Sequence, residues 1–314
     1  MVIGIDISGG DFAPKANVLG AVLALRKLPD FVRIALIGDQ EKIQPLLSDV
    51  ESSVEERLIL VHAPEVITMH DHPTRALPQK PNSSIAVGFE MLSKGKIQSF
   101  ASTGNTGAML VGAMYKVNAI PGVIRPCITS ILPVESGGNS LILDVGTNAD
   151  CKPDVLYQFA RLGSLYAKNV LDKEKPRVAL LNIGEEESKG NLLTQSAYKL
   201  MNGTKDIHFV GNIEGRDLFT GKADVVVCDG FTGNVVLKQA EGIYSIMKKR
   251  GIKDDYFDRF NYENYGGTPI LGVNSDVIIG HGISNEVAVQ NMLIHAFEVA
   301  NSRLTNKIKE AFQK

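Results

Sequence analysis

Tryptophan is absent from the sequence, and cysteine is scarce, with three residues among 314. Cys127, Cys151 and Cys228 lack the paired spacing of a metal site, and two of them follow apolar runs. We therefore expect buried free thiols in a reducing compartment. A redox or nucleophilic thiol is the less favoured alternative.

Excess charge and long apolar runs are also missing. The chain carries 33 basic and 35 acidic residues, a formal net charge of −2, which gives no support to bulk attraction for nucleic acid or an anionic membrane. No apolar stretch approaches the roughly 20 residues of a transmembrane helix. The opening, MVIGIDISGGDFAP, has Asp6 inside an apolar run and no basic leader, so it predicts a first strand and not a signal peptide. We expect a cytoplasmic protein, with contact at the inner face of the membrane as an open alternative.

Three common catalytic signatures do not occur. The sequence has no GxxxxGKS/T phosphate loop, and no GxGxxG turn opens a helix early in the chain. It also lacks the GxSxG elbow of a serine acyl-enzyme. These absences disfavour nucleotide hydrolysis, ordinary dinucleotide binding and a serine nucleophile, and they favour direct attack by a bound anion.

What the sequence does contain is a recurring pattern of apolar run, polar turn and amphipathic helix. It occurs, for example, in VIGIDISGGDFAPKANVLGAVLAL, FASTGNTGAMLVGAMYKV and LILDVGTNADCKPDVLYQFARLGSLYA. Such alternation predicts a three-layer α/β/α fold with a mostly parallel sheet, whose polar turns gather along one edge. We expect six turns to converge on one cleft. Residues 1–314 are interpreted as a single catalytic domain, with two lobes around the cleft as the alternative.

Two turns of similar build are candidates for anion binding. In STGNTGA, Gly104 and Gly107 let the backbone approach a ligand closely, and Asn105 and Thr106 offer hydrogen-bond donors. GFTGN, directly after Asp229, repeats this build. Each turn alone could equally use its glycines for tight packing. Two matched turns before helices favour a phosphate or carboxylate ligand.

Other turns add charged side chains. Lys189 in GEEESKGN is our candidate ligand for phosphate or for a developing oxyanion, whereas Glu185, Glu186 and Glu187 are expected to be mainly solvated. Carboxylates in DVGTNADCKP and DISGGD form no dense oxygen-ligand loop, so a metal is not favoured. His281 in GHGISN follows a strand, where a structural role is the common one and a catalytic role the alternative.

Six motifs together resemble one known family in their order and spacing: DISGGDFAP, STGNTGA, LDVGTNADCKPDVLYQFA, LLNIGEEESKGN, GNIEGRDLFTGKADVVVCDGFTGNVVLK and NYGGTPILGV. The family is PlsX, the phosphate acyltransferases of phospholipid synthesis, and the resemblance spans nearly the whole chain. It implies a fold like that of phosphotransacetylases and isopropylmalate dehydrogenases. The implied reaction converts a long-chain acyl thioester of acyl carrier protein and orthophosphate into acyl phosphate and free carrier protein. The resemblance also implies a homodimer and a downstream glycerol-3-phosphate acyltransferase. We expect neither a cofactor nor a metal.

We expect phosphate to attack the thioester directly, so that the enzyme positions the reactants and stabilises the oxyanion. Lys189 would hold phosphate, Asn191 or a backbone amide would meet the oxyanion, and His281 or a carboxylate would protonate the thiolate if an acid is needed. The predicted phosphate- and substrate-binding residues are Gly9, Gly10, Asp11, Ser102, Gly104, Asn105, Thr106, Gly107, Asn148, Lys152, Asp229, Thr232, Gly233 and Asn234.

Three other function classes are alternatives to this reaction. A phosphotransacetylase-like enzyme would take acyl-CoA in place of the carrier protein. A decarboxylating dehydrogenase would need a nicotinamide cofactor, and the scarcity of clustered arginines argues against its dicarboxylate substrate. A non-catalytic scaffold is least favoured because so many polar turns are expected at one edge.

The sequence departs from the family pattern in three places. Phe12 stands where a histidine is usual, so no catalytic role is assigned there. Before the serine pair, only Arg75 and Lys80 remain of a commonly basic stretch, which predicts a weaker docking patch for the acidic carrier protein. Residues 248–269 are shorter than the helical excursion linked to membrane contact and dimerisation, which weakens the expectation of peripheral membrane attachment.

Overall fold

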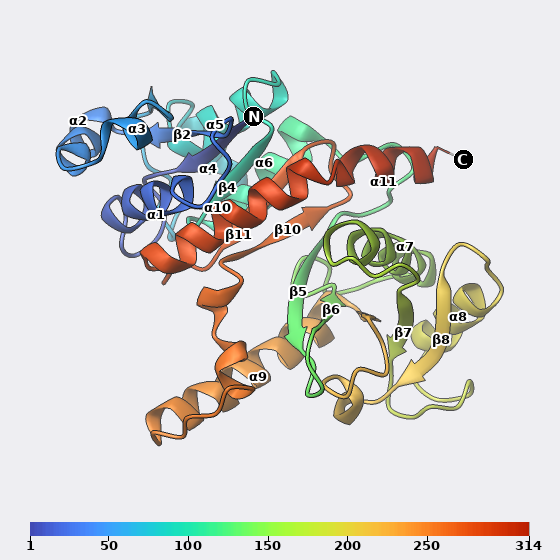
Figure 1. Ribbon diagram of the computed structural model, residues 1–314. Helices are drawn as coiled ribbons and strands as arrows, with labels where there is room; N and C mark the ends of the chain where they lie inside the picture. Colours follow the sequence, from blue (N-terminus) through green and yellow to red (C-terminus); the bar gives the residue numbers. More distant parts are fainter. Residues whose placement is uncertain (314) are drawn as a thin grey trace. The chain divides into compact units, whose positions relative to one another are not determined.

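The computed structural model describes residues 1–313, and the chain forms two compact units. Unit 1 comprises residues 1–119 and 262–305, and unit 2 comprises residues 120–261 and the described chain from residue 306 onward. In Figure 1, residues 1–119 of unit 1 are drawn in blue to teal and residues 262–305 in orange to red. Residues 120–261 of unit 2 are drawn in green to orange, and the red chain from residue 306 onward also belongs to unit 2. The alternation of strands and helices predicted from the sequence is confirmed in both units.

The sheet of unit 1 has the strand order β3-β2-β1-β4-β11-β10. Neighbouring strands are parallel except β10, which pairs antiparallel with β11. Ile3 on β1 lies opposite Ile34 on one side and Ser99 on the other. The strands are β1 (Val2–Asp6), β2 (Arg33–Gly38), β3 (Leu58–His62), β4 (Ser99–Ser102), β10 (Gly267–Leu271) and β11 (Asp276–Gly280).

Helices cover both faces of this sheet. α1 and α10 lie side by side on one face, and α5 packs behind β1 and β4 (Figure 1). Gly20 permits this close helix contact, since a Cβ atom there would lie 2.6 Å from Cγ1 of Val289. The helices are α1 (Lys15–Leu25), α2 (Gln40–Ile43), α3 (Ser52–Glu55), α4 (Pro73–Gln79), α5 (Ser84–Ser93), α6 (Thr106–Gly112) and α10 (Glu286–Asn301), with short helical turns at Gln44–Leu47, Ala113–Val117 and Tyr262–Asn264.

The core of unit 1 lies between the sheet and these helices. Ile3 and Ile5 are fully buried, in keeping with a parallel strand that is covered on both faces. Phe100 on β4 meets Phe89 on α5 edge to face, with ring centroids 5.3 Å apart. Gly88 makes room for this pair, because a Cβ atom there would overlap the Phe100 ring.

The sheet of unit 2 has the strand order β5-β6-β9-β7-β8. β5 and β6 are antiparallel, and the remaining pairs are parallel. α7 packs across β6, β9 and β7, with α8 beside it. The elements are β5 (Cys127–Pro133), β6 (Asn139–Leu143), α7 (Pro153–Val170), β7 (Arg177–Leu181), α8 (Leu192–Asn202), β8 (His208–Ile213), β9 (Val225–Val227) and α9 (Gly230–Lys249), with short helical turns at Gly215–Asp217 and Phe257–Phe260.

The C-terminal helix α11 (Leu304–Phe312) begins in unit 1 and lies mainly in unit 2. Arg161 on α7 holds its end, because its guanidinium donates to the carbonyl oxygen of Ala311 at 2.6 Å and lies 4.3 Å from the centre of the Phe312 ring. α9 differs from the other long helices. It buries only Gly230, Gly233 and Ala240 and runs away from the sheet of its own unit (Figure 1).

Several helix boundaries agree with the sequence signals. Pro153 is the first residue of α7, and Ser83 caps α5 by accepting a hydrogen bond from the Ala86 amide at 3.3 Å. Gly95 follows α5 with φ +67°. In residues 248–269, interpreted as a loop or an excursion, α9 ends at Lys249 and two helical turns lead into β10.

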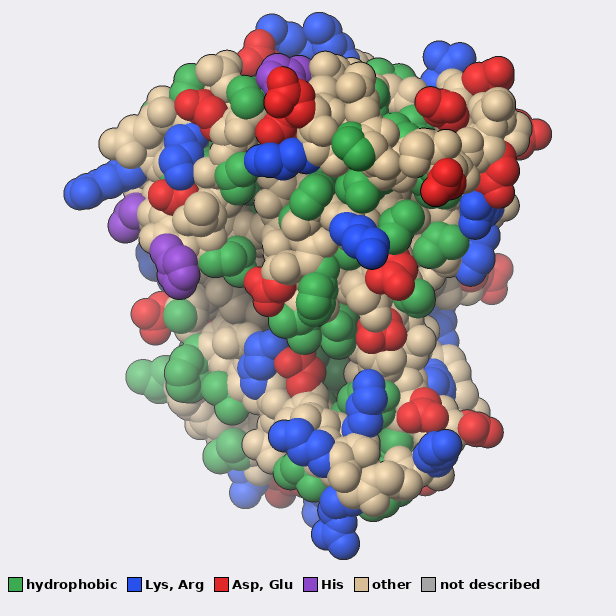
Figure 2. Space-filling view, turned by 90° about the vertical axis from the view of Figure 1, so that its left-hand side faces the viewer, with side chains coloured by type: hydrophobic (Ala, Val, Ile, Leu, Met, Phe, Trp, Pro, Cys, Tyr) green, Lys and Arg blue, Asp and Glu red, His purple; other side chains and the backbone are tan. Residues whose placement is uncertain are grey.

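Charges of both signs are interspersed on the face drawn in Figure 2, in keeping with the net charge of −2. Among residues 1–313, no helix combines the length and the apolar character that crossing a membrane requires.

Candidate active site

The turns after β1, β4 and β11 meet at the carboxyl edge of unit 1. The strand order β3-β2-β1-β4 is that of doubly wound sheets, in which ligands bind outside the carboxyl ends of the two central strands. The Asp11 amide donates to the carbonyl oxygen of Gly282 at 2.7 Å, and the Thr103 hydroxyl donates to that of Gly9 at 2.9 Å. A Cβ atom on Gly9 would lie 2.6 Å from Cα of Gly104, so glycine lets these two turns touch.

A buried carboxylate organises this meeting point. Asp6 accepts hydrogen bonds from the amides of Ser8 at 2.9 Å and Gly9 at 3.1 Å, and from the Ser102 hydroxyl at 2.7 Å. The Ser102 oxygen in turn accepts from the Gly104 amide at 2.9 Å. Burial raises the pKa of Asp6, although these donors act in the opposite direction. Ser102 is thus fully buried and tied to the scaffold of the turn.

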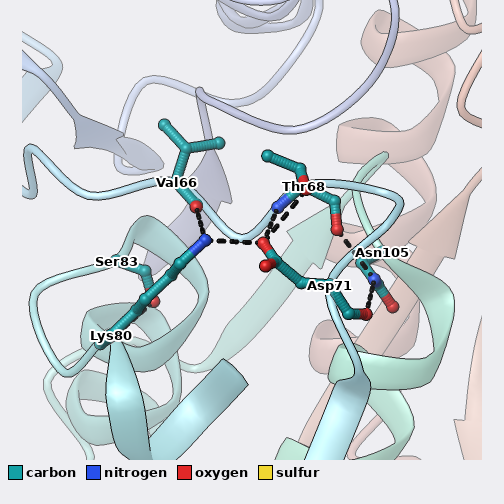
Figure 3. A network of polar contacts seen from close by, with 6 residues as sticks. All are labelled: Val66, Thr68, Asp71, Lys80, Ser83 and Asn105. Carbon is teal, nitrogen blue, oxygen red and sulfur yellow. Dashed lines mark hydrogen bonds and ion pairs between the residues drawn. The ribbon is translucent and has the colours of Figure 1, made fainter. Parts of the chain in front are cut away.

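Asn105 is engaged within the chain. Its Oδ1 caps α6 by accepting from the Ala108 amide at 3.0 Å, and its Nδ2 donates to the carbonyl oxygens of Thr68 at 2.9 Å and Asp71 at 3.2 Å (Figure 3). The donors expected of Asn105 are therefore used to attach the turn to residues 68–71. Thr106, the next residue, is exposed.

The segment in contact with Asn105 is itself held by a polar network (Figure 3). Nζ of Lys80 contacts the Asp71 carboxylate at 2.6 Å and donates to the Val66 carbonyl oxygen at 2.9 Å. The same carboxylate accepts from the Thr68 amide at 2.7 Å, and the Ser83 hydroxyl donates to the Lys80 carbonyl oxygen at 2.7 Å. Lys80, followed by the Thr68 amide, lowers the pKa of Asp71. Lys80 therefore has an internal partner at the position where the sequence predicts a weaker docking patch.

The remaining predicted residues of unit 1 surround this point. His281 directly follows β11, and its ring lies edge-on to Tyr262 with the ring centroids 5.0 Å apart. Gly10 has φ +93°, a conformation that favours glycine. Gly107 lies in the first turn of α6, where a Cβ atom would overlap Pro73.

Unit 2, like unit 1, has a buried carboxylate at the end of a strand. Asp144 follows β6 and accepts from the Ile128 amide at 3.1 Å, from the Asn148 amide at 2.6 Å and from the Asn148 side chain at 2.9 Å. Burial raises its pKa. The Gly230 amide donates to the Asn148 carbonyl oxygen at 2.7 Å, so the turns after β6 and β9 meet.

Polar groups in and beside the GFTGN turn hydrogen-bond to one another. Asp229 caps α9 by accepting from the Thr232 amide and the Thr232 hydroxyl, each at 2.8 Å. Gly233 lies against Asp144, because a Cβ atom there would overlap the Asp144 carbonyl oxygen. Asn234 is exposed.

The turn after β7 presents Lys189. Side-chain amides of three residues fix it: Asn182 donates to the carbonyl oxygen of Lys189 at 3.2 Å, Gln195 donates to that of Gly190 at 3.1 Å, and Asn212 donates to a third carbonyl at 3.0 Å. Gly190 has φ +88°. The backbone of the turn is thereby held from the strand and from α8.

The side chain of Lys189 is exposed, and nowhere in residues 1–313 does it form an ion pair. Glu185, four residues before it, pairs instead with Lys222 at 2.9 Å. Asn191 caps α8 through its Oδ1, which accepts from the Thr194 amide at 2.9 Å. A free ammonium on a fixed turn is suited to bind an anion.

Comparison with known proteins decides the family. A family model described as "Fatty acid synthesis protein" matches residues 1–307. Proteins named "Phosphate acyltransferase" are similar over the whole length, with 40% identity in Salinibacter ruber (99% of this chain and 97% of that protein) and 44% in Heliobacterium modesticaldum (93% and 92%). The chain belongs to the phosphate acyltransferase family. It is therefore an enzyme, and the family resemblance of its motifs is confirmed.

Solved structures share the fold of this chain. A phosphotransacetylase from Streptococcus pyogenes gives a TM-score of 0.69 at 16% identity, covering 96% of this chain and 94% of its own. A branched-chain phosphotransacylase from Enterococcus faecalis V583 gives 0.63 at 15% identity, covering 96% and 99%. A 4-hydroxythreonine-4-phosphate dehydrogenase from Klebsiella pneumoniae gives 0.59 at 12% identity, covering 96% and 99%. The predicted phosphotransacetylase- and dehydrogenase-like α/β fold is thus confirmed.

The predicted site residues fall into two groups, one per unit. In unit 1 they are Gly9, Gly10, Asp11, Ser102, Gly104, Asn105, Thr106, Gly107 and His281, and in unit 2 they are Asn148, Lys152, Lys189, Asn191, Asp229, Thr232, Gly233 and Asn234. Lys152 and Asn234 are exposed, whereas Asn148 is buried beside Asp144. Convergence of all six turns on one cleft stays a prediction.

The thiols are free, as expected. Cys127 and Cys228 are buried, and burial raises the pKa of each. Cys151 is half-buried, and burial raises its pKa to about 11. The thiolate is the reactive form, so these values disfavour a nucleophilic role at neutral pH. Within the described chain, no three His, Cys, Asp or Glu side chains are grouped to hold a metal ion.

Two supports of the site were missed by sequence reasoning. Asn17 on α1 is buried, and its Nδ2 approaches the carbonyl oxygens of Asp6, Ile7 and Gly9 at 3.1, 3.1 and 2.8 Å. The second support is the segment 66–83, whose network meets Asn105. An asparagine within an otherwise apolar helical stretch was the available sequence signal for Asn17. Nothing in the sequence indicated the role of the segment 66–83.

Proposed function

We propose that the protein transfers the acyl group of an acyl-carrier-protein thioester to orthophosphate, which yields acyl phosphate and free carrier protein. The observation that carries this proposal is the similarity, at 38–44% identity along the chain, to relatives named "Phosphate acyltransferase". Their name supports phosphate as the acceptor. The carrier protein as donor rests on the resemblance of the sequence motifs.

In this proposal Lys189 binds the phosphate. Its exposed, unpaired ammonium and the fixed backbone of its turn support the assignment, because only the lysine side chain has to be ordered when the anion arrives. Asn191 is the proposed donor to the thioester oxyanion, since its Oδ1 is used in capping and its Nδ2 remains available. Lys152 and the GFTGN turn are further candidates for phosphate contact.

The glycine turns of unit 1 are proposed to contact the substrate through their solvent-facing residues. Asp11 and Thr106 are exposed, whereas Gly9 and Gly104 serve the close approach of two turns. His281 stays the candidate proton donor in this unit.

The chemistry needs no strong base. Phosphate is partly dianionic near neutral pH, with a second pKa of about 6 in its esters. One phosphate oxygen forms a bond to the thioester carbonyl carbon, and the carbon–sulfur bond breaks as the tetrahedral intermediate collapses. The electron pair leaves on sulfur as a thiolate. A thiol is far more acidic than an alcohol, with a pKa of about 8.5 for cysteine, so protonation by His281 assists departure without being obligatory. The role of the protein is to orient the two reactants and to stabilise the oxyanion.

The test measures thiol release from a long-chain acyl carrier protein with and without orthophosphate, with hydroxylamine present to trap acyl phosphate. The expected result is phosphate-dependent release and a trapped hydroxamate. Release from acyl-CoA but not from the carrier protein would transfer the assignment to a phosphotransacetylase-like enzyme, and release from neither donor would refute acyl transfer.

We further propose a homodimer. Ile243 and Ile246 on α9 are 48% and 59% exposed, which supports burial of this helix against a second copy. The acyl phosphate is a reactive mixed anhydride, so we propose that a glycerol-3-phosphate acyltransferase consumes it. Contact with the inner face of a membrane is part of the same hypothesis and would bring this product close to its acceptor.

A further inference from the structure

We infer that a pocket in unit 1, beside the turn after β1, binds one amide unit of the pantetheine arm of the acyl donor; this inference rests on the proposed acyl transfer. The pocket has a volume of about 150 Å³. Ile7 and Ser8, directly after β1, form one side of it, and Asp39 and Lys42, after β2, form another. It therefore lies at the carboxyl edge of a parallel sheet, where ligands of such folds bind.

The size and lining of the pocket select the chemistry of its ligand. A cavity of about 150 Å³ holds a group of benzene size, roughly six heavy atoms. A complete long acyl chain or nucleotide exceeds this size. Ala13, Pro14 and Val66 add apolar walls, and together with the carboxylate of Asp39 they disfavour a phosphate ion. One amide unit of an extended chain, with its flanking methylenes, fits both the volume of the pocket and its largely apolar lining.

Two polar groups match such an arm. The Ser8 hydroxyl forms no hydrogen bond within residues 1–313, so it is free to donate to an amide carbonyl. Lys42 pairs with Asp39 at 3.2 Å while its side chain stays 63% exposed, as expected at the rim. A rim ammonium can meet the phosphate that ends the arm in both acyl carrier protein and acyl-CoA. In phosphopantetheine two amides alternate with short carbon segments, and this phosphate ends the chain.

The wall formed by Val66 is fixed without a ligand. Nζ of Lys80 donates to the Val66 carbonyl oxygen at 2.9 Å and is held by Asp71 at 2.6 Å. Figure 3 shows the carbonyl of Val66 directed at Lys80 and its side chain on the opposite side of the backbone. A wall that is already ordered lowers the entropic cost of binding a flexible arm.

The experiment fills the pocket with Val66→Phe and compares three donors that share the arm: acyl carrier protein, acyl-CoA and a short-chain S-acyl pantetheine. We expect the KM for all three donors to rise by about tenfold or more and by a similar factor, while the KM for phosphate stays within about twofold. Val61→Phe is the matched control. Val61 is also half-buried but lines a separate groove with Val87 and Met91, so we expect its donor KM values to stay within about twofold.

The outcomes separate this inference from the proposed function. If the wild-type chain transfers no acyl group to phosphate, the proposed function fails. If the wild type is active and Val66→Phe keeps its donor KM values, or raises the value for the carrier protein alone, the pantetheine subsite is refuted. Should Val66→Phe not fold, Ser8→Ala gives the answer in its place. Loss of one hydrogen bond is expected to raise all three donor KM values about fivefold, and unchanged values overturn the inference.

Discussion

Replacement of Lys189 by alanine tests the proposed phosphate site most directly. The ammonium is exposed and has no ion-pair partner in the described structure, so its removal is expected to change the free energy of unfolding by less than about 0.5 kcal/mol. A hydrogen bond to a charged group contributes about 1.5–3 kcal/mol. If Lys189 makes one such bond to phosphate in the transition state, kcat/KM for phosphate falls about 10- to 150-fold.

The assay is the initial rate of thiol release at fixed acyl-carrier-protein concentration and varied phosphate. Lys199→Ala is the control, because Lys199 is an exposed lysine further along α8 and is expected to leave the rate unchanged. Lys189→Arg should restore part of the activity, since it keeps the charge with a different geometry. Phosphate-dependent turnover of Lys189→Ala within about threefold of the wild type would refute the role of Lys189.

Two further predictions concern the supports of the site. Asp71→Asn removes a carboxylate whose pKa is lowered by Lys80, so we expect the wild type to be more stable than the variant above the unfolded-state pKa of about 3.9. The difference in their free energies of urea unfolding should narrow as the pH falls below about 4, because the carboxylate becomes protonated. A difference that stays constant from pH 7 to pH 3 would contradict this account. In Gly190→Ala the new Cβ atom would overlap the side chains of Asn182 and Thr194, at a backbone φ of +88° that favours glycine. We expect the free energy of unfolding in urea to fall by at least about 1–2 kcal/mol and turnover to decrease. Gly203→Ala is the control, because Gly203 lies at a helix end with a negative φ, and it should change neither quantity by much.

Local signals in the sequence predicted the elements well. Apolar runs followed by polar turns gave the parallel strands, and Pro153, Ser83 and Gly95 marked helix boundaries that the structure confirms. These signals work because capping and backbone preference depend on residues near one another in the chain. The same reasoning located Lys189 in the turn after β7.

The sequence by itself determined the fold class, the family and the list of polar turns, since each depends on short-range pattern or on whole-chain similarity. Only the tertiary structure decided which polar groups are already in use. From the sequence, Ser102 and Asn105 were expected to be available to the substrate. In the structure Ser102 is hydrogen-bonded to Asp6, 96 residues away in the chain, and Asn105 to Thr68, 37 residues away. Whether a hydroxyl or an amide is free for a ligand depends on partners that folding brings from distant parts of the chain, and local pattern carries no information about them.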